Sequence, residues 1–141
     1  MKLIEKFSIP NELAKKMIDA AENKAKELGI AVNITIVDEG GNLVAFSRMD
    51  HAPLLSIGIS QNKAYTAIGF KKPTGDWYPM IKDEPALLNG IVHTPKLVIF
   101  GGGFPITVDG HVIGGIGVSG GSAEEDEMCG EAALHIVQQL V

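Results

Sequence analysis

A four-residue segment of the chain holds three side chains that can bind or transfer charge. Arg48, Asp50 and His51 come directly after a run of alternating residues that is typical of a strand. Arginine pairs well with carboxylates, and histidine can ligate a metal or transfer a proton near neutral pH. Loops that follow strands often expose such groups. Two interpretations stay open: a ligand-binding corner, or a surface pair of Arg48 with Asp50 beside a solvated histidine.

The glycines are concentrated between residues 101 and 121. Gly102 and Gly103 follow a predicted strand, and Ser119 and Gly120 stand at the end of another, before the last predicted helix. Glycine lets a second backbone or a flat ligand approach closely, and a helix N-terminus presents unpaired N–H groups to an anion. One interpretation is a floor for a planar ligand that carries carboxylates. The other is that the glycines relieve crowding where helices cross the sheet or where subunits meet.

Further charged residues are candidates for the same ligand. Lys63 lies on a predicted helix, where it either belongs to a solvated face or reaches the cleft beside Arg48. Asp126 and Glu127 fall in the first turn of the last predicted helix, and one of them can turn toward the glycine-rich segment. A favourable interaction with the helix dipole, worth roughly 0.3–1 kcal/mol, is the simpler role of an acid at this position.

Histidine spacing does not predict a zinc site, because the four histidines are widely scattered. His93 lies in an irregular, proline-rich segment, where it is free to swing over a pocket. We therefore predict His51 and His93 as the two histidines that can serve as metal ligands. His111 follows a tight turn and is expected to be exposed, and His135 is expected to lie on the last helix.

Composition and motifs exclude several functions. The net charge of −5 and the lack of a Lys/Arg cluster argue against nucleic-acid binding. There is no phosphate-binding loop, and Ser119 lacks the Gly-x-Ser-x-Gly surroundings of a hydrolase nucleophile. Cys129, the single cysteine, is predicted to be packed in the core. Glu5 and Lys6 interrupt any signal peptide, and no apolar run approaches the ~20 residues that span a bilayer. We expect a cytoplasmic protein without a membrane partner.

Hydrophobic periodicity predicts a single α/β domain over residues 1–141, in the order helix, two strands, helix, three strands, helix. Hairpin turns at 38–42 and Asp109-Gly110 imply a mostly antiparallel sheet of about five strands, flanked by helices. The predicted strands lie at 32–36, 43–48, 97–100, 105–108 and 112–118.

The predicted helices frame this sheet. The first runs over about 9–28 with Ser8 as its N-cap, the second ends near Gly69, and the last runs from near Ser122 to residue 141. The segment from 73 to 95 is irregular, which is typical of a functional or interface element. The apolar residues predicted to face inward from the last helix are Met128, Ala132, Ile136 and Leu140.

Taken in order along the chain, several motifs resemble the GlcG/HbpS-like family, which also supplies the C-terminal domain of PduO-type proteins. The resemblance runs from about residue 8 to the last residue and is carried by residues 37–46, 48–50, 52–54, 56–57, 63–64, 66–67, 102–103, 105–106, 108–110, 113–120 and 126–127. At His51, relatives often carry a small residue instead. The resemblance implies a profilin-like fold, an antiparallel sheet flanked by helices, assembled into homo-oligomers. It also implies haem binding, with haem degradation in some members and a place beside glycolate or diol metabolism in others.

We therefore predict an oligomeric protein that binds haem, or a related tetrapyrrole or small carboxylate ligand, with iron as the metal. Arg48, Lys63 or the N–H groups of the glycine segment would hold the ligand's carboxylates. The resemblance does not choose between His51 and His93 as axial ligand.

Two alternatives remain. One is a small enzyme that acts on a hydroxy- or oxo-acid, in which Arg48 holds the carboxylate and Asp38, Asp50 or Glu127 moves a proton. The other is an assembly module without a ligand, which predicts a filled core and no pocket.

Overall fold

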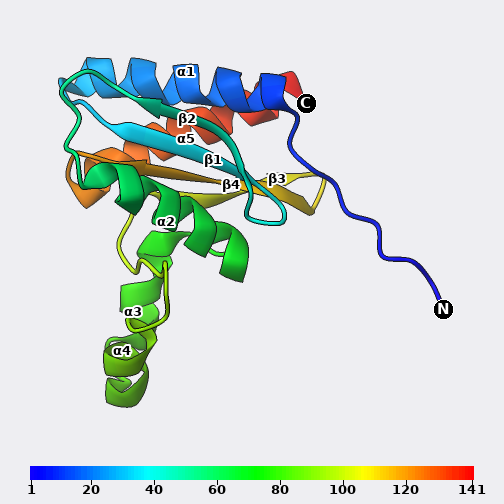
Figure 1. Ribbon diagram of the computed structural model, residues 1–141, viewed down its shortest axis with the longest axis vertical. Coiled ribbons are helices and arrows are strands. Elements are labelled where there is room, and N and C mark those ends of the chain that lie inside the picture. Colours follow the sequence, from blue (N-terminus) through cyan, green and yellow to red (C-terminus); the bar gives the residue numbers. More distant parts are fainter.

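A four-stranded antiparallel sheet forms the centre of the molecule, with helices on both of its faces (Figure 1). The computed structural model describes residues 1–141. The strands lie in the order β2-β1-β4-β3. They are β1 (Asn33–Asp38), β2 (Leu43–Arg48), β3 (Gly103–Val108) and β4 (His111–Ser119). The long helices are α1 (Asn11–Leu28) and α5 (Ala123–Leu140) on one face and α2 (Ser56–Phe70) on the other.

The hydrophobic core lies between the sheet and the layer made by α1 and α5. Met17 of α1, Ile34 and Ile36 of β1, and Ile116 of β4 are fully buried there. Alternate residues of the same strands point to the opposite face, where α2 covers them. The predicted mixed α/β architecture with a flanked antiparallel sheet is confirmed.

Both predicted hairpins are present because their turns have the necessary local chemistry. Between β1 and β2, the Asp38 carboxylate accepts hydrogen bonds of 2.9 Å from the backbone N–H groups of Gly40 and Asn42. Between β3 and β4, Asp109 and Gly110 both have positive φ, 49° and 80°, as a two-residue hairpin turn requires.

The prediction of a strand at 97–100 is wrong, and the sheet has four strands rather than about five. The hydroxyl group of Thr66 in α2 holds this segment through two hydrogen bonds. That oxygen donates to the carbonyl of Lys96 at 2.9 Å and accepts from the backbone N–H of Val98 at 3.0 Å. Val98 is therefore held at a helix, where it is buried, instead of pairing with a strand.

The ends of the helices differ in how well the sequence predicted them. Helix α1 begins at Asn11 with Pro10 as its N-cap, so the predicted cap at Ser8 is wrong. The reason is that Ile9 donates its N–H to the carbonyl of Ile113 at 3.1 Å, which keeps the preceding chain extended. The predicted start of the last helix near Ser122 is confirmed: α5 begins at Ala123, and Ser122 and Glu125 form a reciprocal capping box there.

The inward face of α5 is rotated by about one residue from the predicted one. Cys129, Ala133 and Val137 are buried, whereas Met128 and Leu140 are exposed. Small residues face inward because Phe104 of β3 fills the space beside Gly130, where an added Cβ would lie 2.6 Å from the ring. The apolar spacing alone does not reveal this bulky neighbour.

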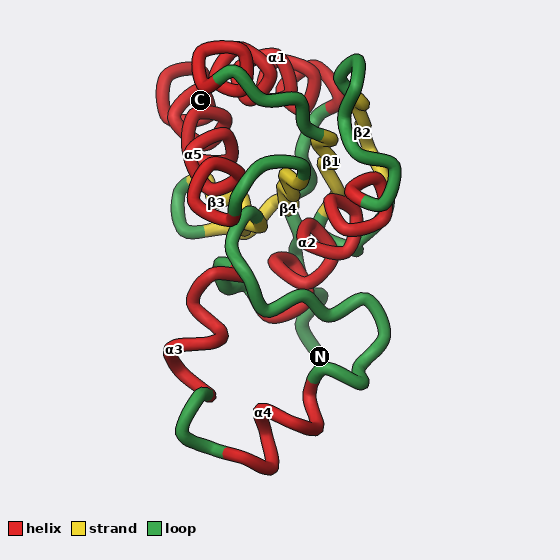
Figure 2. The backbone as a smooth tube through the Cα atoms, turned by 90° about the vertical axis from the view of Figure 1, so that its left-hand side faces the viewer, coloured by secondary structure: helices red, strands yellow, loops and turns green.

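Residues 71–97 project away from the sheet and helices (Figures 1 and 2). They include a short 3-10 helix η1 (Thr74–Asp76), α3 (Trp77–Ile81) and α4 (Pro85–Ile91). Trp77 and Ile81 are buried and anchor the start of this projection, whereas α4 buries no residue. No helix in the chain is both long and apolar enough to cross a lipid bilayer.

Candidate functional site

The glycines of the predicted ligand floor lie where α2 crosses the sheet. A Cβ atom added to Gly117 would lie 2.0 Å from the carbonyl oxygen of Ser60, and one added to Gly115 would lie 2.7 Å from that of Ala64. A Cβ atom added to Gly103 would likewise lie 2.5 Å from the carbonyl oxygen of Lys63. These glycines therefore let the backbone of α2 lie directly on β3 and β4. This supports the interpretation that the glycines relieve crowding where a helix crosses the sheet.

Lys63 occupies the space beside Gly102. The Lys63 ammonium group lies 3.0 Å from the Asp126 carboxylate and donates to the carbonyl of Val118 at 2.8 Å. The two charged side chains are only 1% and 3% exposed. A Cβ on Gly102 would come within 2.7 Å of the lysine nitrogen, and the ring of Phe100 lies 5.2 Å from it. The lysine is thus part of a buried ion pair rather than of a solvated face.

The electrostatics of this pair follow from its burial. Loss of water lowers the pKa of Lys63, and the adjacent Asp126 opposes that change. Burial likewise raises the pKa of Asp126, opposed by Lys63 and by the N–H of Gly121, which the carboxylate accepts at 2.8 Å. Of the two acids that could turn toward the glycines, Asp126 is the one that pairs with Lys63.

Glu127 lies on the outer side of the same region. Its carboxylate is next to Gly101 and Gly75, where an added Cβ would come within 2.5 Å and 3.0 Å of it. Burial is the main cause that raises the pKa of Glu127, and the carboxylates of Glu131 and Asp76 add to it. Glu127 thus differs from Asp126, because neighbouring acids as well as burial raise the pKa of Glu127.

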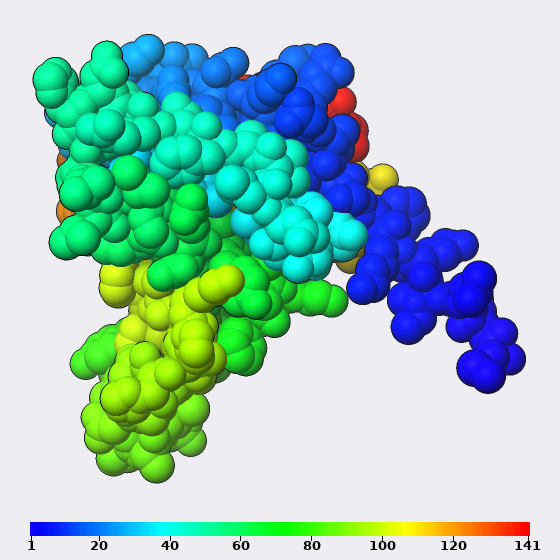
Figure 3. Space-filling view, viewed as in Figure 1, coloured from blue at the N-terminus to red at the C-terminus, as the bar shows by residue number.

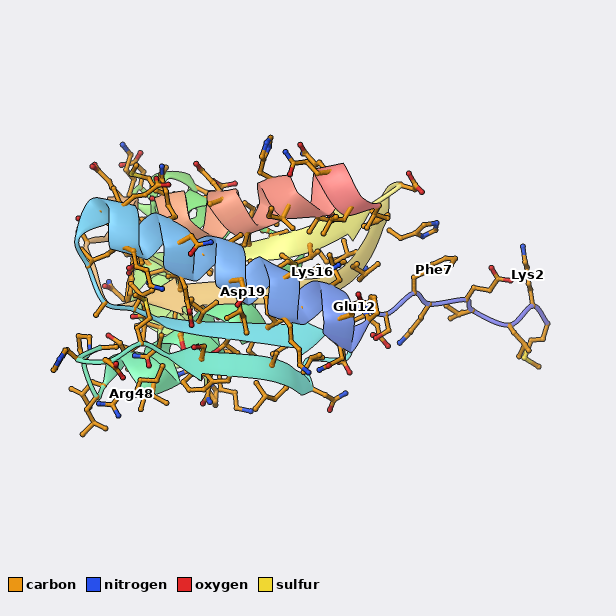
Figure 4. All side chains as sticks on the ribbon, turned by 90° about the horizontal axis from the view of Figure 1, so that it is seen from above. Lys2, Phe7, Glu12, Lys16, Asp19 and Arg48 are labelled. Carbon is orange, nitrogen blue, oxygen red and sulfur yellow. The ribbon has the colours of Figure 1, made fainter.

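Arg48, Asp50 and His51 form an exposed corner at the end of β2. His51 adopts a left-handed backbone conformation, with φ of 69°, which is uncommon for a residue other than glycine. Leu54 and Leu55 follow in the same loop and are 75% and 80% exposed. In Figure 4, Arg48 lies at the far end of the sheet from the extended residues that precede α1.

Two hydrogen bonds tie this loop to β1 and to the residue before it. The N–H of Met49 donates to the carbonyl of Val32 at 3.1 Å, and the side-chain amide of Asn33 donates to the carbonyl of Pro53, also at 3.1 Å. The loop is fixed at both ends although its apolar residues contact solvent.

The sheet order divides the predicted site residues into two groups. Asn33 pairs with Arg48 on one side and with Ser119 on the other, so Arg48 and Ser119 are two strand spacings apart, about 10 Å. The exposed corner contains Arg48, Asp50 and His51, and the second group contains the buried residues Lys63, Gly102, Gly103 and Ser119 with the half-buried Gly120. Gly120 packs against Ala31, where an added Cβ would lie 2.5 Å from the carbonyl oxygen.

The structure does not bring together the residues of the hydroxy- or oxo-acid enzyme hypothesis. Glu127 contacts the segment before β3, whereas Arg48 lies on β2, about three strand spacings or 14 Å away across the sheet. Asp38 is occupied by the turn that it stabilises. Only Asp50 remains near Arg48, and that hypothesis stays a prediction.

The other histidines lie in different surroundings. His93 is exposed at the end of α4, on the projection, and His135 shares a hydrogen bond of 3.2 Å with Gln139. His111 is exposed, as predicted, but its ring also lies 4.4 Å from that of Phe7 at the edge of a cavity. Sequence reasoning missed this cavity, because its walls come from three separate parts of the chain, residues 7–16, 108–113 and 140–141.

We name this cavity of about 520 Å³ the terminal groove. It is lined by Phe7, Ser8, Pro10, Glu12, Leu13, Lys16, Val108, Asp109, His111, Ile113, Leu140 and Val141. A second, smaller cavity of about 230 Å³ lies between α2 and the β1–β2 hairpin, with Asn62, Tyr65 and Lys96 in its wall. Nowhere do three His, Cys, Asp or Glu side chains gather in a way that could hold a bare metal ion.

Comparison with known proteins gives three informative similarities. A 15.0 kDa protein from the dhaT-dhaS intergenic region of Citrobacter freundii is 41% identical over 128 residues, which cover 90% of each chain. The crystal structure of protein ORFY of Klebsiella pneumoniae is 34% identical and superposes with a TM-score of 0.94 over 100% of this chain and 98% of that one. The crystal structure of a PduOC:haem complex is 32% identical, with a TM-score of 0.84, and covers 91% of this chain and 94% of that one.

A family model covers nearly the whole fold just described. It is the model for haem degrading protein HbpS-like, and it matches residues 9–135, from Ile9, two residues before α1, into the last turns of α5. This match confirms the resemblance expected from the motifs, and the chain belongs to the HbpS-like family.

Proposed function

We propose that this protein binds haem at the exposed corner formed by Arg48, His51, Leu54 and Leu55. The observation that carries the proposal is the similarity to the PduOC:haem complex, which extends over 91% of this chain at 32% identity. A haem group needs a nitrogen or sulfur ligand for iron, an apolar surface for its ring, and cations near its carboxylates.

The corner contains one residue of each kind. His51 offers an exposed imidazole, and the left-handed backbone at this residue is the kind of strain that functional sites retain. Leu54 and Leu55 give an apolar surface in the same loop, and Arg48 supplies a guanidinium group suited to a carboxylate. Because the porphyrin supplies four nitrogen ligands, a single histidine is enough, and no cluster of protein ligands is needed. Bound haem would supply an iron centre for small ligands or electrons.

The second wall of this site is proposed to come from another copy of the chain. Neither the terminal groove nor the second cavity includes His51, and the corner is exposed, so a second copy would supply the other face of the ring. A homo-oligomer in which two corners meet would enclose haem between apolar surfaces. Lys63 does not take part in this proposal, since it is paired with Asp126.

His93 is the second candidate ligand. It is exposed beside the exposed residue Val92, on the projection that leaves the body after α2. A haem held there would contact α4 rather than the end of β2, so variants of the two histidines distinguish the sites.

The experiment is a titration of the purified protein with hemin, followed by the Soret band. The wild-type protein is expected to saturate near one haem per chain or per subunit interface. His51→Gly should abolish the change in the iron spectrum while keeping the fold, because glycine accepts the left-handed conformation at no cost. Arg48→Ala should weaken binding roughly three- to tenfold, as expected for loss of one solvated charge-assisted hydrogen bond.

His135→Ala is the matched control and should leave the titration unchanged. A spectrum altered by His93→Ala and not by His51→Gly would move the site to the projection. Binding no tighter than to an unrelated acidic protein would remove the proposal altogether.

A further inference from the structure

Residues 1–6, which we call the arm, are exposed along their whole length. Residues 1–6 run away from the body, as Figures 1 and 3 show for the blue end of the chain. Leu3 and Ile4 are 90% and 86% exposed, so two large apolar side chains of this arm contact almost nothing. Adjacent exposed apolar residues on an extended segment are typical of a peptide that binds to another surface.

The arm is fixed where it leaves the body. Ile9 is buried and donates its N–H to the carbonyl of Ile113, and the ring of Phe7 packs against that of His111. These contacts set the direction in which the preceding residues emerge. The arm therefore starts at the edge of the terminal groove and points away from it, so it does not fill the groove of its own chain.

The terminal groove has the chemistry to receive such an arm. Leu13, Val108, Ile113 and Leu140 give it apolar walls, and Leu140 is exposed. Its volume of about 520 Å³ is in the range of cavities that bind ligands.

Charge on the two surfaces is complementary. The arm carries Lys2 and Lys6 against the single acid Glu5. The rim of the groove carries the acids Glu12 and Asp109 and the base Lys16; Lys16 pairs with Glu12 at 3.4 Å, which leaves Asp109 as the acid without an ion pair. An arm with excess positive charge thus faces a rim with excess negative charge, which favours their association.

We propose that the arm of one copy of this chain binds in the terminal groove of a second copy, and that the second copy's arm does the same in return. Six extended residues reach at most about 20 Å, enough to pass from one groove to a neighbouring one across a two-fold axis. The exchange forms a dimer and does not propagate to further copies, since each copy gives one arm and receives one. This interface lies at the opposite end of the sheet from the Arg48 corner and does not depend on haem.

The test is a cysteine cross-link between two differently tagged variants of the full chain. Leu3→Cys is placed in one variant and Leu140→Cys in the other, so a disulfide between residues 3 and 140 can only join two molecules. Cys129 is fully buried and does not interfere. Mild oxidation of the mixture is expected to give the mixed dimer, identified by its two tags and by mass spectrometry.

The control mixture pairs Leu3→Cys with Leu43→Cys, an equally solvent-exposed site on β2 outside the groove. It should give at least tenfold less mixed dimer at the same protein concentration. Equal cross-linking of the two mixtures, or none in either, would overturn the proposal.

A second measurement tests the contact between the arm and the terminal groove without introduced cysteines. Leu3→Glu with Ile4→Glu, on exposed positions that cannot disturb the core, should raise the dissociation constant of the dimer at least tenfold in analytical ultracentrifugation. Leu140→Glu should do the same from the groove side, and Leu43→Glu should not. If hemin binding is lost in Leu140→Glu and association is unchanged in the arm variant, the groove holds haem and the arm proposal is wrong.

Discussion

The ammonium group of Lys63 and the carboxylate of Asp126 lie 3.0 Å apart in a region that water barely reaches. A buried charge that loses its partner is left without compensation, which typically costs about 3–5 kcal/mol. We expect Lys63→Met and Asp126→Asn each to lower the free energy of unfolding by an amount in this range, measured by urea denaturation. The double variant should lose clearly less than the sum of the two. Strictly additive losses would mean that the two groups do not interact.

Gly117 is the position at which a methyl group should cost most. Its added Cβ would lie 2.0 Å from the carbonyl oxygen of Ser60, and backbone cannot move aside as a side chain can. Gly117→Ala is expected to destabilise the protein by about 3 kcal/mol. Gly69→Ala, within α2 but with nothing within 4 Å of the added Cβ, should be neutral or stabilising by about 0.5–1 kcal/mol. Thermal unfolding of the two variants side by side checks this, and similar melting temperatures would contradict it.

The contribution of Glu127 to the free energy of unfolding should fall as the pH rises above 4.5, the ordinary pKa of this carboxyl group. Burial and neighbouring acids raise the pKa of Glu127 above its usual value of 4.5, so the folded chain binds this proton more tightly than the unfolded chain. The resulting stabilisation is complete below pH 4.5 and is lost as the pH rises through the folded-state pKa. We therefore expect the stability of Glu127→Gln, relative to wild type, to increase between pH 4 and pH 7. Glu84→Gln, on an exposed residue of the projection, is the control; a pH-independent difference for Glu127→Gln would count against this assignment.

Cys129 should be inert toward thiol reagents in the native state. Burial is the main cause that raises the pKa of Cys129 to about 11, so little reactive thiolate exists near neutral pH. A disulfide reagent at pH 8 is expected to label less than a tenth of the native protein in the time that labels all of it in urea. Leu43→Cys supplies an exposed thiol that reacts at once. Rapid labelling of native wild type would mean that α5 opens readily.

The sequence was informative wherever a structural choice is local. The turns at Asp38 and at Asp109-Gly110, and the start of α5 near Ser122, depend on residues close by in the chain, and all were predicted. The segment 97–100 was misassigned because its conformation is fixed by Thr66, some thirty residues earlier in the chain.

Lys63 illustrates why the site was harder to predict than the fold. A lysine on a helix is usually solvated, and its burial depends on the space left by Gly102 and on the acid at Asp126. The glycines and the acid were both noticed in the sequence, but nothing local indicated that one lysine joins them. His111 was missed as a cavity residue for a similar reason, since Phe7 and Leu140 meet it only in three dimensions.

The direct contact of α2 with β3 and β4 has a mechanical consequence. Where backbone rests on backbone, no layer of side chains can rearrange to let the helix slide, so α2 and the sheet act as one stiff unit. The loop from Met49 to Leu55 joins two parts of that unit and is tethered at each end by hydrogen bonds to residues 32 and 33. The backbone at His51 is consequently preorganised, and a ligand that binds there has little backbone conformational entropy to remove.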